Sequence, residues 1–239
     1  MSVLFIGGSG LLGRHVRELE PQWDYPTHQE FDILDWSGMK LALSMLDHPV
    51  TNIIHAAAFI SPPKVEADPM QAMQVNIVGT VNMVRLAQRC DARLIYISTD
   101  YVFNGERGNY LEEHPVHPVN KYAWSKLGGE CAVRMYGSGL IIRGSFGPAP
   151  FPYPKAYTDH YTTKLPVAEF AKRLVRVVKN APGLHGVLHI GGESRSLYEY
   201  AREVSPDLPI EPVSRATANP EPPRNTSLNT NKFDILVKA

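Results

Sequence analysis

The chain has 239 residues, of which 44% are hydrophobic and 20% are charged, enough for one globular unit with a sizeable core. Its 24 Lys and Arg residues balance its 24 Asp and Glu residues, so nothing in the charge points to a nucleic acid or an anionic membrane as partner. The two cysteines, Cys90 and Cys131, are expected to be buried free thiols rather than a disulfide or a metal site. With no secretory signal and no apolar run long enough for a membrane span, we expect a cytoplasmic protein.

Short apolar runs alternate with helical patterns along the chain. We expect strands at Val3–Ile6, Trp23–Thr27, Asn52–His55, Arg93–Ile97, Leu140–Arg143 and Gly186–Ile190. The sequence predicts helices at Leu11–Leu19, Trp36–Leu46, Pro69–Cys90, Asn120–Met135, Val167–Val178 and Leu197–Val204. Strands that alternate with helices form parallel sheets covered on both faces, so we expect an α/β protein with a doubly wound parallel sheet, the Rossmann fold. Residues 1–145 are expected to form a dinucleotide-binding core, and residues 146–239 a compact C-terminal part that also returns elements to the core.

Three glycines, Gly7, Gly10 and Gly13, follow the first expected strand and open the first expected helix. Glycines in such a turn let the chain reverse tightly, let backbone N–H groups approach a pyrophosphate, and let the helix pack on the strand. The positive end of the helix then faces the phosphates. The spacing therefore predicts a dinucleotide site at this turn.

The tip of the second expected strand should meet the adenosine ribose of the dinucleotide. An acid at this tip favours NAD, whereas its absence together with a basic group favours NADP. The stretch from Tyr25 to Gln29 holds no acid and includes His28, although Glu30 and Asp32 follow closely. We therefore expect NADP(H) to be favoured over NAD(H); the alternative for His28 is an ordinary solvated loop histidine.

Tyr122 and Lys126 are four residues apart in an expected helix, which puts both side chains on one face. A tyrosine hydroxyl titrates near about pH 10, and a neighbouring ammonium lowers that pKa, so Tyr122 is a candidate proton donor to a developing alkoxide. Thr99 follows the apolar strand that ends at Ile97, where open parallel sheets bind their ligands. Its hydroxyl can hydrogen-bond a substrate carbonyl.

Motifs along nearly the whole chain resemble those of extended short-chain dehydrogenases/reductases and, among them, the dTDP-4-dehydrorhamnose reductase group. The most specific of these motifs runs from Ser98 to Gly105. The others are Gly7–Gly13, Phe31–Ile33, His55–Phe59, Val75–Thr80, Tyr122–Glu130, Leu140–Arg143 and Pro223–Thr230.

The resemblance implies NAD(P)H-dependent reduction of the 4-keto group of a nucleotide-activated deoxysugar, with a small C-terminal substrate-binding part. Whether the protein forms a homodimer stays open. It implies that the catalytic residues are Thr99, Tyr122 and Lys126. The implied cofactor-binding residues are Gly7, Gly10, Leu11, Leu12, Gly13, His28, Asp32, Ile33, Ala56, Ala57, Ala58, Asn76, Tyr122 and Lys126. Among them, Asn76 would support Lys126 from behind the site. The implied substrate-binding residues are Asp100, Tyr101, Phe103, Phe146 and, as a candidate for the substrate pyrophosphate, Arg224. No metal is expected.

The chain also departs from this reductase group. It is shorter after Arg143, Phe146 stands where the reductases commonly have tryptophan, and Ile60 stands where they commonly have threonine. These positions face the sugar in the family, so the sugar and the nucleotide stay open.

Two alternative functions stay open as well. One is another sugar-nucleotide epimerase or dehydratase on the same fold. Dehydratases typically place an acid pair after the catalytic threonine, but here Asp100 is followed by Tyr101, and the acid/base pair of epimerising reductases, often Cys and His, is not visible. The other is a non-catalytic, cofactor-binding regulatory subunit like that of methionine adenosyltransferase, which is similar to this reductase group.

Overall fold

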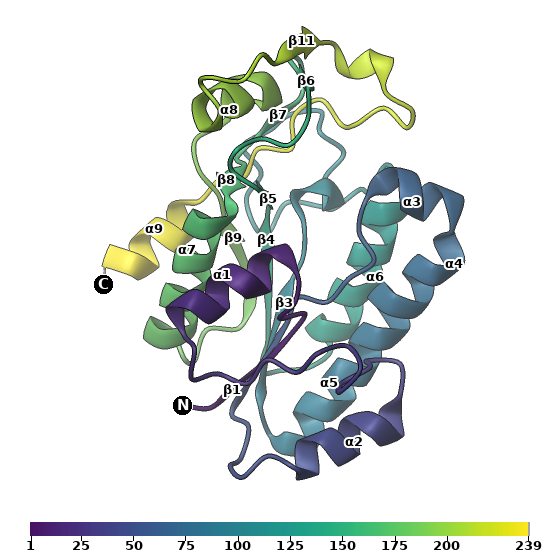
Figure 1. Cartoon of the computed structure of the whole chain (residues 1–239), viewed down its shortest axis with the longest axis vertical. Coiled ribbons are helices and arrows are strands. Elements are labelled where there is room, and N and C mark those ends of the chain that lie inside the picture. The colour runs from purple at the N-terminus through teal and green to yellow at the C-terminus, as the bar shows by residue number, and fades with distance from the viewer. Residues whose placement is uncertain (239) are drawn as a thin grey trace.

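The computed structural model describes residues 1–238. A central sheet of five parallel strands runs in the order β1 (Val3–Ile6), β2 (Asn52–His55), β3 (Arg93–Ile97), β4 (Gly139–Gly144) and β9 (Gly186–Ile190) (Figure 1). Apart from exposed Gly186, every residue of these strands is buried, as expected for a parallel sheet covered on both faces. The predicted α/β fold with a parallel sheet is confirmed.

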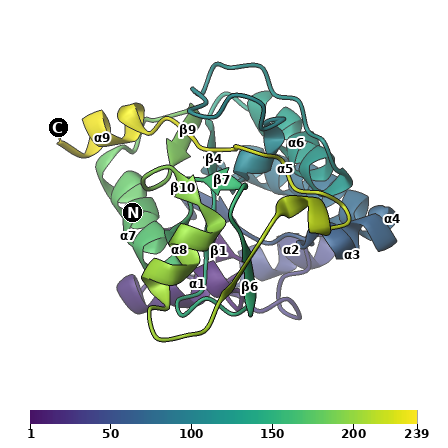
Figure 2. The ribbon, with the colours of Figure 1, turned by 90° about the horizontal axis from the view of Figure 1, so that it is seen from above.

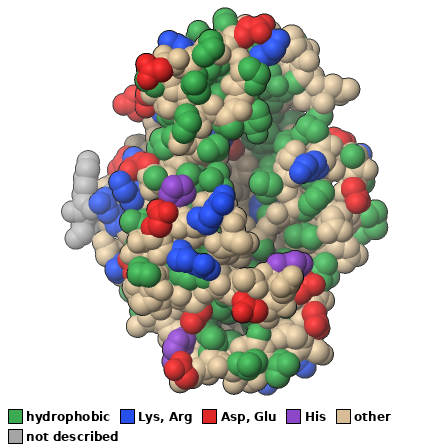
Figure 3. Space-filling view, in the orientation of Figure 1, with side chains coloured by type: hydrophobic (Ala, Val, Ile, Leu, Met, Phe, Trp, Pro, Cys, Tyr) green, Lys and Arg blue, Asp and Glu red, His purple; other side chains and the backbone are tan. Residues whose placement is uncertain are grey.

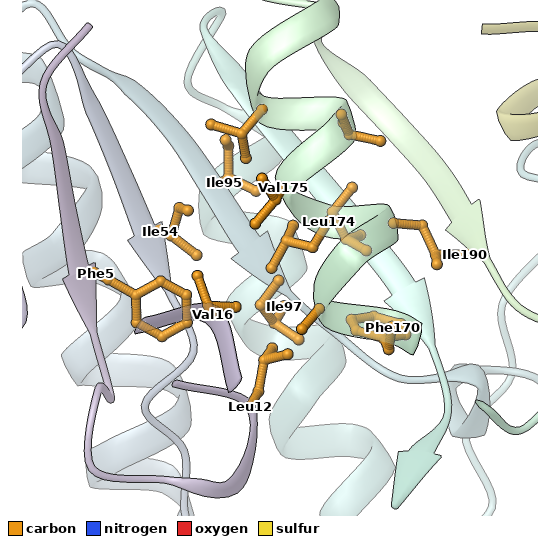
Figure 4. Packing of buried hydrophobic residues seen from close by; sticks show 14 of the residues in the cluster. Phe5, Leu12, Val16, Ile54, Ile95, Ile97, Phe170, Leu174, Val175 and Ile190 are labelled. Atoms are coloured by element: carbon orange, nitrogen blue, oxygen red, sulfur yellow. The ribbon is translucent and has the colours of Figure 1, made fainter. Parts of the chain in front are cut away.

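Helices form a layer on each side of the sheet. On one side lie α1 (Leu11–Leu19) and α7 (Val167–Asn180), which pack against each other and against the sheet. Their apolar stripes meet strand residues such as Phe5 and Ile95 in the core shown in Figure 4. On the other side lie α2 (Trp36–Ser44), α5 (Gly79–Cys90) and α6 (Lys121–Arg134), which build a second core around Met39 and Met83.

Residues 23–27 do not form the expected strand. Asp24 makes only an isolated parallel bridge to Leu4, in which the Phe5 amide donates to the Asp24 carbonyl at 2.8 Å. Pro26 has no N–H to continue the pairing. The chain then turns at Thr27, whose backbone N–H and hydroxyl both donate to the Glu30 carboxylate.

The long helix expected at Pro69–Cys90 is interrupted by a change of pitch. It consists of α4 (Pro69–Ala72), the π-helical turn η1 (Met73–Val78) and α5. Such π turns inside helices occur frequently at functional sites. Before them, α3 (Pro62–Ala67) was not expected from the sequence.

The C-terminal part both joins the core and adds a lobe above it. From it, α7 and β9 complete the central layers, and α9 (Asn231–Lys238) packs against both. The lobe contains α8 (Leu197–Val204), the pair β6 (Lys155–Tyr157) and β11 (Glu211–Val213), and η3 (Arg215–Thr217). It lies over one end of the central sheet (Figures 1 and 2).

Two more short strand pairs connect the lobe to the core. They are β5 (Phe146–Gly147) with β8 (Leu165–Pro166), and β7 (Tyr161–Thr162) with β10 (Arg195–Ser196). Within residues 1–238, no helix has the length and apolar character that a membrane span requires.

Candidate active site

The glycine turn between β1 and α1 is shaped by close backbone packing. Gly7 has φ +99°, and a Cβ there would lie 2.7 Å from the backbone nitrogen of Ala57. A Cβ on Gly13 would lie 2.5 Å from the carbonyl oxygen of Gly7. A Cβ on Gly10 would meet only that same oxygen, at 3.2 Å. Gly7 and Gly13 are therefore required by the turn itself, whereas Gly10 faces the open space in front of it.

That open space is a cavity of about 820 Å³, which we call the larger cavity. The surface is hollowed below the C-terminal lobe (Figure 3). Most of the expected cofactor residues line the larger cavity: Gly7, Gly10, Leu11, Leu12, His28, Asp32, Ile33, Ala56, Ala57 and Ala58. Gly13 lies behind the turn and does not. A cavity of this size at a glycine turn and a helix N-terminus fits a dinucleotide.

The segment after β4 also lines the larger cavity, on the side away from the glycine turn. The sequence did not indicate that this segment contributes to the cavity. Its lining residues there are Phe146, Gly147, Pro148, Phe151, Pro152 and Tyr153. Residues 147–154, which contain four prolines and lie in no expected helix or strand, thus form part of the expected cofactor site.

A second cavity of about 310 Å³, the smaller cavity, lies beyond the ends of β3 and β4. It brings together the expected catalytic residues Thr99, Tyr122 and Lys126. Asp100, Tyr101 and Phe146, expected at the sugar, line it too. The two cavities share Ala56, Ala58, Ile60, Ile97, Phe146 and Lys164, so a ligand in one would meet a ligand in the other.

Tyr122 is held as a neutral phenol. Burial raises its pKa to about 12; a hydrogen bond with Thr99 opposes this shift, and the Asp100 carboxylate adds to it. The expectation of a lowered pKa is wrong, because burial dominates and the Lys126 ammonium is not among the groups that shift it. Tyr122 is therefore protonated at neutral pH and can act as a proton donor.

Lys126 lies deep below Tyr122. Its ammonium donates to the Ile97 carbonyl at 2.7 Å and lies 4.1 Å from the centre of the Tyr96 ring. Burial lowers the pKa of Lys126 to about 7, and the Glu130 carboxylate opposes this. Lys126 thus reaches the strand end from the helix that carries Tyr122.

Thr99 and Asp100 are fixed by segments far apart in the chain. The Thr99 hydroxyl accepts from the Tyr101 amide at 3.2 Å at the start of η2 (Asp100–Val102). The buried Asp100 carboxylate accepts from the hydroxyls of Thr162 at 3.0 Å and Thr226 at 2.7 Å. The C-terminal part is thereby tied directly to the catalytic loop.

A buried ion pair supports the loop that carries Thr99 and Asp100. Arg143 in β4 and Glu130 in α6 are completely buried and lie 2.7 Å apart, and Glu130 also accepts from the Ser98 hydroxyl at 2.5 Å. Because both charges are paired and hydrogen-bonded, the network tolerates burial and fixes the residue next to Thr99.

Two expected substrate residues lie elsewhere. Phe103 is fully buried and stacks on Tyr110 at 4.2 Å between ring centres, in a small core outside both cavities. Arg224 is exposed and lines neither cavity; it contributes only its carbonyl, which accepts from the Tyr161 amide at 2.8 Å. The tail thus runs past the site with its backbone, and neither the Phe103 nor the Arg224 side chain lines either cavity, so their assignment to the substrate stays a prediction.

Asn76 does not line the larger cavity either. In the π turn, its amide nitrogen donates to the Phe59 carbonyl at 2.9 Å and to the Ser125 hydroxyl at 2.8 Å, and its side-chain oxygen accepts from the Phe59 amide. It joins the loop after β2 to α6 next to Lys126, as expected for a supporting residue, and its contact with the cofactor stays a prediction.

Sequence reasoning missed the part of the smaller cavity that comes from the C-terminal part: His160, Thr162, Lys164 and Leu197. His160 is buried, with Nδ1 2.6 Å from the Pro223 carbonyl and Nε2 3.5 Å from the Tyr101 hydroxyl. Burial lowers the pKa of His160. No motif marks these residues, because only tertiary packing brings their segment to β3.

The cysteines are not the buried pair that was expected, because Cys131 is exposed and Cys90 is only partly buried. Among residues 1–238, no group of three His, Cys, Asp or Glu side chains is arranged to hold a metal ion.

A parallel sheet, a glycine turn at a large cavity, and Thr99, Tyr122 and Lys126 at the adjoining strand ends together define an extended short-chain dehydrogenase/reductase, a class of NAD(P)-dependent oxidoreductases. Comparison with known families agrees. The model of the RmlD substrate binding domain matches residues 1–146, and the chain belongs to this family.

Two kinds of characterised protein resemble this chain in sequence. The beta subunit of methionine adenosyltransferase 2 from Rattus norvegicus is 29% identical over 98% of this chain and 82% of its own length. The dTDP-4-dehydrorhamnose reductase of Streptomyces griseus is 33% identical over 59% of this chain and 48% of its own.

Among solved structures, a hypothetical dTDP-4-dehydrorhamnose reductase from Sulfolobus tokodaii has a TM-score of 0.84 at 25% identity, covering 98% of this chain and 94% of its own. A Bacillus anthracis dTDP-4-dehydrorhamnose reductase in complex with NADP has a TM-score of 0.85 at 24% identity, covering 98% of this chain and 91% of its own, which supports the fold.

Proposed function

We propose that this protein reduces the 4-keto group of a nucleotide-activated deoxysugar with a reduced nicotinamide dinucleotide. The observation that carries the proposal is the meeting of Thr99, Tyr122 and Lys126 in the smaller cavity, which adjoins the larger, dinucleotide-sized one. The dTDP-4-dehydrorhamnose reductases among the relatives support this substrate class.

A reduced nicotinamide, when bound, would supply the hydride that the keto carbon takes up. Thr99 donates a hydrogen bond that orients the keto oxygen, and the hydroxyl of Tyr122 donates the proton that this oxygen takes up. The product is the alcohol, and Tyr122 recovers its proton from solvent. Lys126 holds the nicotinamide ribose and stabilises the transient phenolate of Tyr122 by its charge.

The test is a panel of dTDP-, UDP- and GDP-linked 4-keto-6-deoxyhexoses with NADPH, in which cofactor oxidation is followed and the product sugar identified. Reduction of at least one of them at the 4-keto position is the expected result. No turnover of any of them by protein shown to bind NADPH would contradict the proposal.

A second candidate function rests on the high coverage of the methionine adenosyltransferase beta subunits, which exceeds that of the reductases. On this view the chain binds a dinucleotide and acts through contact with a partner enzyme. NADPH binding without turnover, together with co-purification of a methionine adenosyltransferase from the native cells, would favour this function over reduction.

We further propose that NADP(H) is preferred over NAD(H). His28 and Pro26 line the larger cavity where the adenosine is expected, and Glu30, the nearest acid after the loop, is held by Thr27. Tighter binding of NADPH than of NADH by calorimetry is expected, with the difference reduced in His28→Ala. Tighter binding of NADH would contradict this preference.

A further inference from the structure

Lys164 lies at the junction of the two cavities and lines both of them. Its side chain crosses the backbone of Gly147, where a Cβ would lie 2.8 Å from Lys164 Cε. The lack of a side chain at residue 147 therefore leaves the space in which the lysine reaches the junction.

The ammonium of Lys164 has little of its bonding capacity satisfied by the protein. It donates to the Phe146 carbonyl at 2.8 Å, which uses one of its three N–H groups. Within the described chain, Lys164 makes no ion pair with any carboxylate. Asp100, whose charge acts on Lys164, has its carboxylate hydrogen-bonded to Thr162 and Thr226 instead.

No other cation is placed to serve both cavities. Lys164 is the one lysine or arginine that lines the larger cavity within residues 1–238. The smaller cavity also contains Lys126, but this ammonium is buried below Tyr122 and donates to the Ile97 carbonyl. A half-buried ammonium with no carboxylate in direct contact is costly, and such charges are normally paired.

We infer that Lys164 is an anion-binding residue that contacts a phosphate oxygen at the junction of the two cavities. A lysine ammonium binds phosphate as a compact point charge with several donors. The phosphate can come from the dinucleotide in the larger cavity or from the diphosphate of a nucleotide sugar in the smaller one. The second source rests on the proposed function, and the first requires only dinucleotide binding.

The test uses Lys164→Met, which keeps the length of the side chain and removes its charge, and Lys164→Arg, which keeps the charge. Lys172→Met, at an exposed position on α7, is the matched control. Calorimetry measures the Kd of NADPH for the free protein and the Kd values of dTDP, UDP and GDP for the NADPH-saturated protein. A lost charge-assisted hydrogen bond should weaken one of these ligands by about tenfold or more in Lys164→Met. Lys164→Arg should retain most of the affinity, and Lys172→Met all of it.

The two titrations distinguish the sources of the phosphate. Weaker binding of NADPH alone assigns Lys164 to the cofactor, and weaker binding of the nucleoside diphosphate alone assigns it to the substrate. If the wild-type protein binds none of dTDP, UDP and GDP, the proposed substrate class fails and the NADPH titration alone decides on Lys164. Affinities within about twofold of wild type for every ligand that the protein binds would overturn the inference. Thermal unfolding of Lys164→Met, and of Lys164→Gln should the first variant not fold, keeps this result separate from misfolding.

Discussion

In the proposed reaction Tyr122 starts with its proton in place, because burial raises its pKa to about 12. Removing its hydroxyl in Tyr122→Phe deletes the proton donor while keeping the ring that lines the smaller cavity. We expect kcat for reduction of the keto sugar to fall by about 10²- to 10⁴-fold, with the Kd of NADPH unchanged. Steady-state kinetics and calorimetry on the same preparation check both. A kcat above about a third of the wild-type value would mean that another group donates the proton.

His55, at the end of β2, makes stability depend on pH. It is completely buried beside Thr80, and burial together with the nearby Lys126 charge lowers its pKa to about 3. Above the unfolded-state pKa of about 6.5 both states are neutral; below it only the unfolded chain takes up the proton, down to about pH 3. Stability is therefore lost as the pH falls, by about 1.4 kcal/mol from His55 alone at pH 5.5 relative to pH 8.

Urea unfolding at the two pH values measures this effect. His55→Gln, which has no titrating group, should lose about 1.4 kcal/mol less than wild type between pH 8 and pH 5.5, whatever its stability at pH 8. The exposed His185→Gln should behave like wild type. Equal losses in wild type and His55→Gln would show that His55 does not titrate differently in the folded and unfolded states.

At the scale of elements, glycines in the turn from β1 into α1 serve two different purposes: Gly10 leaves space for a ligand, and Gly13 allows close backbone packing. Gly10→Val places a side chain in the mouth of the larger cavity with only the Gly7 oxygen nearby, whereas Gly13→Val forces a Cβ to within 2.5 Å of the turn's backbone. We expect Gly10→Val to fold with a near-native Tm and to lose NADPH binding, and Gly13→Val to lose stability itself. Calorimetry and thermal unfolding of both variants test this. Undiminished NADPH affinity in Gly10→Val would place the cofactor elsewhere.

The same scale shows which elements could be predicted from sequence. The strands β1, β2, β3 and β9 and the helices α1 and α8 coincide with their expected ranges, because apolar periodicity alone decides buried strands and amphipathic helices. At residues 23–27 the apolar and aromatic residues were right for a strand, but Pro26 ends the pairing after one bridge. The lobe strands β5, β7, β8 and β10 have two residues each, too few for any pattern to show.

For the molecule as a whole, the candidate site combines residues that local sequence patterns predict with residues that only long-range packing brings to it. Thr99, Tyr122, Lys126 and the glycine turn could be predicted, because each follows a strand or lies on a helix whose position the local pattern sets. His160 and Lys164 could not, because their segment reaches β3 only through long-range contacts. Asp100 shows this directly: its partners Thr162 and Thr226 are 62 and 126 residues away. Arg224 lies in the expected part of the tail, but there the chain hydrogen-bonds through its backbone to Tyr161 and exposes the Arg224 side chain to solvent.

The tail contacts the loop that carries Thr99 and Asp100 through the Thr226 hydroxyl. Removing this hydroxyl should therefore lower both the stability and the activity of the protein. Thr226→Val preserves shape and deletes the hydroxyl that donates to Asp100 at 2.7 Å, leaving a buried carboxylate short of one donor. We expect the free energy of unfolding to fall by about 1–3 kcal/mol, and kcat/KM to fall with it because Asp100 adjoins Thr99. Thr226→Ser keeps the donor and should restore most of both. Urea unfolding and steady-state kinetics measure the effects; a Thr226→Val protein as stable and active as wild type would show that the hydroxyls of Thr162 and Thr99 suffice to hold Asp100 in place.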